Sequence, residues 1–366
     1  MDVLATWRKS ATVIAVVALA TGGSVAFAHG GPGRGSDAPA AQVFTLAEPQ
    51  HGNPEGVAFD KRTGQFFVSA TGDGSIYRGT LDDTTTPVPV FIPGATGQSA
   101  TGLKVRQGKL YVAGAATGTI KVYDLSDGHL LATFDTTGGS GAPTFVNDLV
   151  VTGRGDVFAT DSFRPAIYHL SAEEIAAGTP APKPIAAGDV ISTAPEIPFD
   201  ATPGTFNLNG IVSVGGGGRG AHHGGGRFKL IVVDTKTGRL FRVVVGGGER
   251  RIRELVVRGG PFPGGDGLLV DRARLLVVQG SAEGFPNGVI DVVKLRHHGR
   301  ARLESRFTDP TLKGPSTIAR ARDRYLVVNA DFATSTQPFT VTALSRKGRH
   351  GHRHGHGHGH GRGHAR

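Results

Sequence analysis

The feature that most restricts the fold is a short motif that recurs six times along the chain. Each copy has a polar residue, then a small or polar residue, then an aliphatic residue at the start of a β-rich run. A turn and a second β-rich run follow every copy. Short strands that recur in regularly spaced repeats along the chain are typical of a β-propeller with one sheet per repeat. We therefore predict an all-β, six-bladed β-propeller. The six polar residues are Glu55, Thr101, Asn147, Asn209, Asp266 and Ser316.

The propeller is expected to occupy residues 43–344, and the sequence changes character on either side of it. Residues 1–28 combine a basic start, an apolar run and a small-residue cleavage signal, which is the pattern of a secretory signal peptide. The alternative is an uncleaved membrane anchor, but the apolar run at 11–20 is well short of the roughly 20 residues that span a bilayer. We therefore expect a secreted or extracytoplasmic protein without a stable membrane span after cleavage. A flexible linker is expected at 29–42, and a strand at 42–46 is expected to close the ring.

Residues 345–366 form a tail rich in His, Gly and Arg that offers nothing with which to build a core, so we expect it to be disordered. Its closely spaced imidazoles could bind Zn, Ni or Cu, and the alternative is a cationic segment that only keeps the protein soluble. Much of the formal net charge of +10 lies in this tail. The nearly balanced body does not suggest a nucleic-acid partner, because phosphate binding needs clustered cations. The sequence contains no Cys, which excludes disulfides, thiolate metal sites and thiol nucleophiles.

The six polar residues of the motif are expected to meet on the axis of the propeller. The innermost strand of each blade runs along this axis, so equivalent residues of the repeats stand at one level around a central channel. Two carboxylates and two amide oxygens that converge there, without Cys or His, form a hard oxygen cage. Ca²⁺ is the best candidate for it, because this ion accepts irregular sets of roughly six to eight oxygens. The alternative is that pairs such as Asn209-Gly210 and Asp266-Gly267 only form turns before each strand.

Four phrases make the chain similar to a known family. Together with the six repeats, they resemble the regucalcin and gluconolactonase family of calcium-dependent six-bladed propellers, which is related to the paraoxonases. The resemblance implies that Glu55, Asn209 and Asp266 hold a divalent metal and that Asn147 faces it through substrate or water. The phrases are Pro54-Glu55-Gly56-Val57-Ala58-Phe59, Val146-Asn147-Asp148, Leu208-Asn209-Gly210-Ile211 and Gly265-Asp266-Gly267-Leu268.

Two departures from the family pattern concern the substrate. Sugar-lactone members of the family carry an arginine two residues before the Asn-Asp pair, where this chain has Phe145, and the Asn-Gly pair follows Leu208 in place of proline. These changes imply an apolar pocket wall, so a less polar ester or lactone is favoured over a sugar lactone. The expected substrate pocket consists of Phe145, Asn147, Thr101 and Ser316.

The function expected from these features is the hydrolysis of a small lactone or ester by a monomeric, exported protein. Ca²⁺ would polarise the carbonyl, and Asp266 or Asp148 would activate a water beside Asn147. His51, four residues before Glu55, is a second candidate base. Covalent serine chemistry is disfavoured, because no Gly-x-Ser-x-Gly sequence follows a strand and opens a helix. The alternative is a non-catalytic exported propeller that serves as a binding or scaffold protein and holds a structural Ca²⁺.

Overall fold

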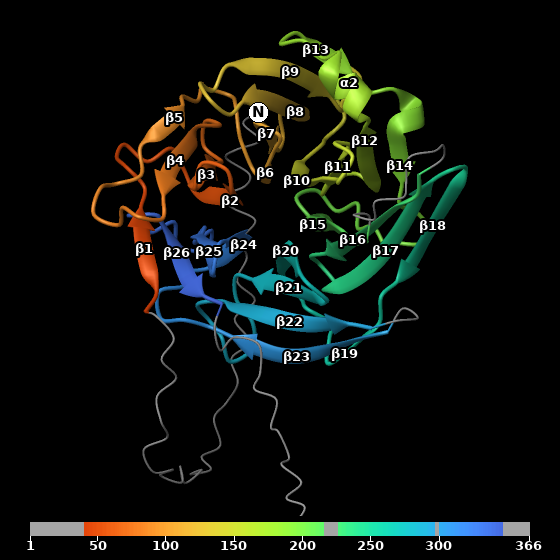
Figure 1. Cartoon of the computed structure of the whole chain (residues 1–366). Coiled ribbons are helices and arrows are strands. Elements are labelled where there is room, and N and C mark those ends of the chain that lie inside the picture. The colour runs from red at the N-terminus through yellow and green to blue at the C-terminus, as the bar shows by residue number, and fades with distance from the viewer. Residues whose placement is uncertain (1–39, 216–225, 297–299, 347–366) are drawn as a thin grey trace, which may run out of the picture.

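The computed structural model describes residues 40–215, 226–296 and 300–346, which form an almost entirely β structure. Within these residues, six sheets stand around a central axis (Figure 1). The predicted six-bladed β-propeller is therefore confirmed. The predicted signal peptide at 1–28 lies outside the described residues, and so does the predicted tail at 345–366 except for its first two residues, of which Ser345 is the buried last residue of the final strand.

Each blade is built on an antiparallel sheet of four strands, ordered outward from the axis. The first strands, which surround the axis, are β2 (Pro54–Phe59), β6 (Leu103–Arg106), β10 (Val146–Val151), β15 (Leu208–Ser213), β20 (Gly265–Asp271) and β24 (Pro315–Ala321). The second strands are β3 (Gln65–Ala70), β7 (Lys109–Ala113), β11 (Val157–Asp161), β16 (Phe228–Asp234), β21 (Arg274–Gln279) and β25 (Arg324–Asn329). Each first strand contacts the first strands of the two neighbouring blades, so the six of them form a closed wall around the channel.

The outer half of each blade consists of a third and a fourth strand. The third strands are β4 (Ile76–Thr80), β8 (Thr119–Asp124), β12 (Ala166–Leu170), β17 (Arg239–Gly246), β22 (Val289–Leu295) and β26 (Thr340–Ser345). The fourth strands of the first five blades are β5 (Val90–Ile92), β9 (Leu130–Asp135), β14 (Val190–Ser192), β18 (Glu249–Glu254) and β23 (Ala301–Phe307).

The amino-terminal strand completes the last blade. Strand β1 (Gln42–Thr45) pairs antiparallel with β26, and Phe44 lies opposite Val341 in this pairing. The expected closure of the ring by the run at 42–46 is confirmed. It joins the first and last strands of the propeller through ladder hydrogen bonds, so β26 is not left as the outer edge of the last blade.

Four short elements lie outside the four strands of each blade. Strand β13 (Pro182–Pro184) pairs parallel with β9, and β19 (Val257–Arg258) pairs parallel with β23. Helix α2 (Ala172–Ala176) starts at Ser171, whose side chain forms a capping box with Glu174, and a 3₁₀ helix, η1 (Ala187–Asp189), precedes β14. Within the described residues, no helix is long and apolar enough to cross a membrane.

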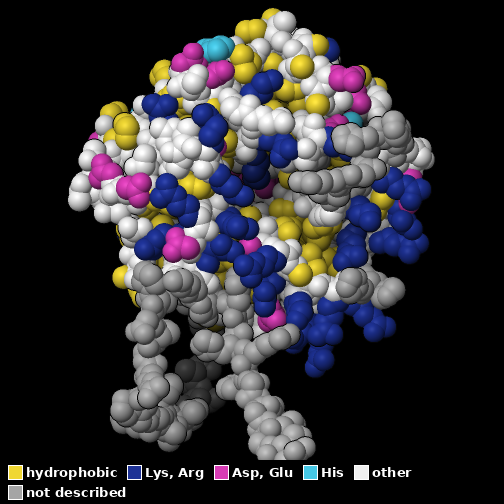
Figure 2. Space-filling model, viewed as in Figure 1, with side chains coloured by type: hydrophobic (Ala, Val, Ile, Leu, Met, Phe, Trp, Pro, Cys, Tyr) yellow, Lys and Arg dark blue, Asp and Glu magenta, His cyan; other side chains and the backbone are white. Residues whose placement is uncertain are grey.

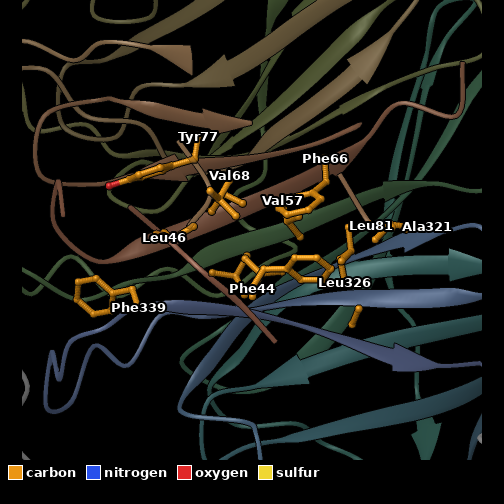
Figure 3. Packing of buried hydrophobic residues seen from close by; sticks show 14 of the residues in the cluster. Phe44, Leu46, Val57, Phe66, Val68, Tyr77, Leu81, Ala321, Leu326 and Phe339 are labelled. Carbon is orange, nitrogen blue, oxygen red and sulfur yellow. The ribbon is translucent and has the colours of Figure 1, made fainter. Parts of the chain in front are cut away.

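The hydrophobic core is divided into six clusters, one between each pair of neighbouring blades. Figure 3 shows the cluster between the last and the first blade, where Phe44 and Leu46 pack between residues of β2, β3 and β25. The rings of Phe44 and Phe66 meet edge to face, with their centroids 5.0 Å apart. Both faces of each sheet are therefore buried over much of their area, which explains the long apolar runs in the second strands.

Candidate metal centre

The candidate site lies where the first strands of the blades begin. In five blades, the pairing between the first and second strands shifts register just after the first residue. In the remaining blade, Thr101 and Gly102 precede β6 and pair with Ala113. The motif residues therefore occupy the same place in each blade. Hydrogen bonds or close backbone contacts connect them to the neighbouring blades. The residue pairs within the five register shifts are Glu55-Gly56, Asn147-Asp148, Asn209-Gly210, Asp266-Gly267 and Ser316-Thr317.

Close packing between blades explains why glycine follows four of the six polar residues. A Cβ atom at Gly56 would lie 2.4 Å from the carbonyl oxygen of Thr101 in the next blade. One at Gly210 would lie 2.2 Å from the carbonyl oxygen of Asp266. Both glycines lie inside strands, β2 and β15, and neither has a positive φ. These glycines are needed for the approach of neighbouring backbones and do not form turns.

Two of the six polar residues hold the channel wall together. The Thr101 hydroxyl donates to the carbonyl oxygen of Val146 at 3.0 Å, and the Ser316 hydroxyl donates to the carbonyl oxygen of Glu55 at 2.7 Å. Both residues are only 1% exposed. Each hydroxyl is buried and bridges two blades, which gives Thr101 and Ser316 a structural role in the channel wall; their place in a substrate pocket stays a prediction.

Three other motif residues present oxygens that have no hydrogen-bond partner. Glu55 Oε2, Asn209 Oδ1 and Asp266 Oδ1 are each buried and unpaired. They come from three different blades, on β2, β15 and β20. An unpaired buried acceptor costs about 1–3 kcal/mol, so three of them in one wall call for a ligand that the protein chain itself does not supply. The three residues predicted to hold a metal are thus the ones that offer free oxygens.

The raised pKa values of the two carboxylates also indicate a site for a ligand. Burial, followed by the nearby charges of Asp266 and Asp148, raises the pKa of Glu55 well above its usual value, while Lys104 opposes the shift. Burial and the charge of Asp148 raise the pKa of Asp266, and an interaction with the Asn209 side chain opposes it. Two acids that disfavour each other's charge form a site that a cation would stabilise.

The carboxylate of Asp148 is engaged in other contacts. Its Oδ1 accepts from Lys104 Nζ at 2.9 Å and from the backbone N–H of Leu149 at 2.8 Å. Its Oδ2 accepts from the backbone N–H of Ile211 at 3.3 Å. Asp148 is 3% exposed and ties three neighbouring blades together. Both of its oxygens are therefore occupied, which leaves Asp266 as the better placed of the two predicted bases.

Asn147 is hydrogen-bonded to a residue that adjoins an aromatic cluster. Its Nδ2 donates to Ser162 Oγ at 2.8 Å. Phe163, which follows Ser162, and Phe145, two residues before Asn147, have ring centroids 5.3 Å apart, and Phe206 packs edge to face on Phe145 at 4.9 Å. All three rings are half-buried. The apolar wall predicted from Phe145 is therefore present and is larger than the sequence indicated.

A buried acid fixes the position of these rings. Asp161 is fully buried at the end of β11, and its Oδ1 accepts from the backbone N–H groups of Phe145 and Phe163, both at 2.9 Å. Its Oδ2 accepts from the hydroxyls of Thr144 and Tyr168. Beside Phe163, a cavity of about 400 Å³ opens; it is lined also by small residues of the segment 137–144 and by Ala116. This volume is sufficient for a small organic group.

His51 has a partner that the sequence did not reveal. Its Nδ1 lies 2.6 Å from Asp73 Oδ2, and its backbone N–H donates to Tyr77 Oη at 3.2 Å. The pair lies at the same end of the first blade as Glu55, because His51 precedes β2 and Asp73 follows β3. A carboxylate at this distance orients the imidazole ring.

Sequence reasoning missed Lys104, Asp161, Phe163 and Phe206. Lys104 and Asp161 are isolated charges within β-rich runs, and their partners stand 44 and about 16 residues away in the chain. No periodic pattern marks such pairs. Within the described residues, no group of three His, Cys, Asp or Glu side chains gathers to hold a metal, because the candidate set consists of two carboxylates and an amide. The His-rich tail lies outside the described residues.

Comparison with known proteins places the fold. No protein-family model and no curated protein matches the sequence. A calcium-binding regucalcin from Agrobacterium tumefaciens has 18% identity and a TM-score of 0.53, covering 82% of this chain and 93% of that one. A gluconolactonase from Xanthomonas campestris has 18% identity and a TM-score of 0.53, covering 83% and 90%. A luciferin-regenerating enzyme has 14% identity and a TM-score of 0.56, covering 86% and 98%. The structural neighbours of this chain are thus regucalcin- and gluconolactonase-type propellers, and the chain shares their six-bladed fold.

Proposed function

We propose that the protein is an exported, metal-dependent hydrolase of an apolar lactone or ester, with Ca²⁺ held in the central channel. The observation that carries this proposal is the set of three buried, unpaired oxygens on Glu55, Asn209 and Asp266. Two carboxylates and an amide are hard ligands, and Ca²⁺ accepts such sets in irregular geometry with water in the remaining positions. The likeness of the fold to a calcium-binding regucalcin and to a gluconolactonase is consistent with this assignment.

When bound, the cation would polarise the carbonyl of the substrate and balance the charge that develops on its oxygen. The attacking water forms a bond from its oxygen to the carbonyl carbon and gives a proton to the Asp266 carboxylate. The ester C–O bond then breaks, and the proton passes to the leaving alkoxide. Asn147 Nδ2 is held by Ser162 Oγ, and the amide oxygen of Asn147 would help to orient the substrate.

The aromatic cluster and the adjoining cavity favour an apolar substrate. A hydroxyl-rich sugar lactone would place its hydroxyls against Phe145, Phe163 and Phe206, which offer no hydrogen-bond partners. An aryl or aliphatic ester would instead remove the exposed parts of these half-buried rings from water. Asp161 acts on the substrate through these rings and is a positioning residue.

The proposal is tested by assaying a panel of aryl esters and apolar lactones with and without a calcium chelator. Asp266→Asn and Glu55→Gln are expected to lower kcat/KM at least about 100-fold, because each removes a ligand charge and Asp266→Asn also removes the base. Glu173→Gln, an exposed carboxylate on α2, is the matched control and is expected to have no effect. Turnover that resists the chelator would contradict the metal mechanism, and direct Ca²⁺ titration of each variant separates lost binding from lost chemistry.

A non-catalytic propeller with a structural Ca²⁺ is the second candidate. It is favoured by the channel wall itself, in which Thr101, Ser316 and Asp148 are engaged in bonds between blades. This candidate predicts Ca²⁺ binding with no turnover of any ester or lactone. Export through a signal peptide at 1–28 and transition-metal binding by the His-rich tail are separate proposals. Amino-terminal sequencing of the secreted protein and metal retention by a variant ending at Arg346 test them.

A further inference from the structure

Cationic residues surround the channel at the end opposite the candidate metal centre. At this end, every blade turns from its first strand to its second, and each of the six turns has Lys or Arg within it or beside it. Figure 2 shows this face, with Lys and Arg gathered around the central hollow. We call this set the turn ring. Its members are Lys61, Arg62, Arg106, Lys109, Arg154, Arg227, Lys229, Arg272, Arg274, Arg322 and Arg324.

Arginine side chains of the turn ring reach from one blade to the next. Arg106 Nη2 donates to the carbonyl oxygen of Gly153 in the following turn at 2.5 Å. The guanidinium of Arg154 lies against Gly226 of the fourth blade, and that of Arg322 lies against Gly64 of the first blade. The cations of the turn ring therefore extend across the gaps between neighbouring turns at these three places.

Much of this positive charge is not neutralised by the protein. Carboxylates pair with four members of the ring: Arg62, Arg227, Arg274 and Arg322. Among the described residues, four exposed members of the ring form no ion pair within 4.0 Å: Lys61, Arg154, Lys229 and Arg272. Exposed like charges held close together raise the local concentration of anions and attract an anionic partner.

The charge also differs between the two halves of the propeller. Residues 46–200, in blades 1 to 3, contain 10 Lys and Arg against 17 Asp and Glu. Residues 201–346, in blades 4 to 6, contain 22 Lys and Arg against 11 Asp and Glu. On the rim of the first two blades, exposed acids such as Asp82, Asp83 and Asp127 surround the turn ring. The net charge is therefore −7 in the first half (10 − 17) and +11 in the second (22 − 11), which favours blades 4 to 6 over the acidic rim of the first two blades as the path of an anion.

We propose that the turn ring docks a linear anionic polysaccharide that carries sulfate or carboxylate groups and runs from the central hollow over blades 4 to 6. A narrow chain can follow this path, whereas a flat anionic bilayer would press on the acidic rim as well. Guanidinium groups bind such oxyanions through paired hydrogen bonds. Among the described residues, the exposed large hydrophobic side chains are Val190 and Val256, so the face offers no aromatic platform for nucleic-acid bases. The proposal does not depend on the hydrolase activity, because the two sites lie at opposite ends of the channel.

Titration calorimetry with heparin, a sulfated linear polysaccharide, tests the proposal on the full chain and on a variant that ends at Arg346. The second protein removes the cationic tail but keeps every strand of the six sheets. Lys61→Glu combined with Lys229→Glu is expected to weaken binding about tenfold or more and to lower the salt dependence of log affinity by about two charges. The matched control is Lys183→Glu combined with Lys313→Glu, two exposed lysines away from the ring, and is expected to change affinity less than about threefold.

Three results would overturn the proposal. One is loss of heparin binding in the variant that ends at Arg346, which would assign the binding to the tail. Another is equal weakening by the control pair, which would reduce the effect to net charge. The third is equally tight binding of duplex DNA at the same salt concentration, which would replace polysaccharide docking with general polyanion binding. Melting temperatures of all variants show whether each one is folded.

Discussion

Carboxylates along the channel differ in what their oxygens contact, and this difference separates structural acids from reactive ones. Asp161 accepts from two backbone N–H groups and two hydroxyls, so its charge is fully solvated by the protein. Asp148 is balanced by Lys104 and two backbone N–H groups. Glu55 and Asp266 each keep a buried oxygen without a donor. The charge of this last pair is therefore the one that needs an added cation.

The raised pKa values of Glu55 and Asp266 predict how the metal-free protein responds to pH. An acid whose pKa is higher in the folded protein than in the unfolded chain contributes stability that is fully present below its unfolded pKa, about 4, and is lost as the pH rises through its folded pKa. In chelator, the melting temperature should therefore fall as the pH rises above that value and through the raised pKa values of the pair. Asp266→Asn should flatten the difference between pH 5 and pH 8 measured by calorimetry. A variant with the same pH slope as the parent protein would contradict the assignment.

Calcium should oppose this loss of stability at neutral pH. A ligand that binds only the folded state at about 100 times its Kd stabilises it by about 2.7 kcal/mol. Wild-type protein should gain stability on that scale when Ca²⁺ replaces chelator, and Asp266→Asn should gain much less. An equal gain in both proteins would place the binding of Ca²⁺ elsewhere, for example on the acidic rim.

At the scale of the element, the first strands combine two tasks in their opening residues. The register shift releases the motif residues from the regular ladder, and hydroxyl groups of neighbouring blades donate to the backbone carbonyl oxygens that are freed. One such contact is the donation from Thr160 Oγ1 to the carbonyl oxygen of Asn209 at 2.6 Å. Glycine at the next position lets the neighbouring strand approach. The same few residues therefore determine both the spacing of the blades and the position of the candidate ligands.

Gly210→Ala should disturb both tasks together. Its new Cβ would lie 2.2 Å from the carbonyl oxygen of Asp266 and 2.9 Å from the backbone nitrogen of Leu268, and neither backbone atom can move without shifting β20. We expect a loss of about 1–3 kcal/mol in the free energy of unfolding, and weaker Ca²⁺ binding, measured by denaturant titration and calorimetry. Gly188→Ala is the matched control, because no atom lies within 4 Å of its Cβ position and its φ is not positive. Equal effects of the two changes would contradict the close-approach explanation.

At the scale of the whole molecule, the propeller is a ring of six interfaces between blades. The ring closes at one of them, the interface between the last and the first blade. The cluster between the last and first blades includes Phe44 of β1, which is 1% exposed. Since β1 also pairs with β26, the amino-terminal segment contributes both a ladder and packing to the closure. Loss of this strand would leave the two ends of the chain joined only by contacts between side chains and inner strands.

Phe44→Ala tests the contribution of this closure. Removing a fully buried phenylalanine costs about 3–5 kcal/mol, and the cavity would lie between the two blades that close the ring. We expect a drop of this size in the free energy of unfolding by denaturant, with Thr45→Ala, on the half-buried side of the same strand, changing it much less. A small effect of Phe44→Ala would mean that the remaining contacts between the two blades suffice to close the ring.

At the candidate site, the sequence predicts the positions of the six polar residues of the motif but not all of their roles. Their register was predicted, because a repeat period is visible along the chain and symmetry assigns equivalent positions to one level. Their roles were not all predicted. The hydroxyls of Thr101 and Ser316 form hydrogen bonds between blades, and the carboxylate of Asp148 accepts a hydrogen bond from Lys104, a residue of another blade. The aromatic wall was seen only at Phe145, because Phe163 and Phe206 join it from other loops.

The sequence by itself determined the strands, their number per repeat, the six blades and the closing strand, because strand alternation and turn chemistry are local properties of the chain. Only the tertiary structure decided which polar atoms remain free. Whether an oxygen is satisfied depends on donors from blades that lie tens to hundreds of residues away in the chain. The same holds for the turn ring, whose cations are dispersed in sequence and gather only because every blade turns at the same end of the channel.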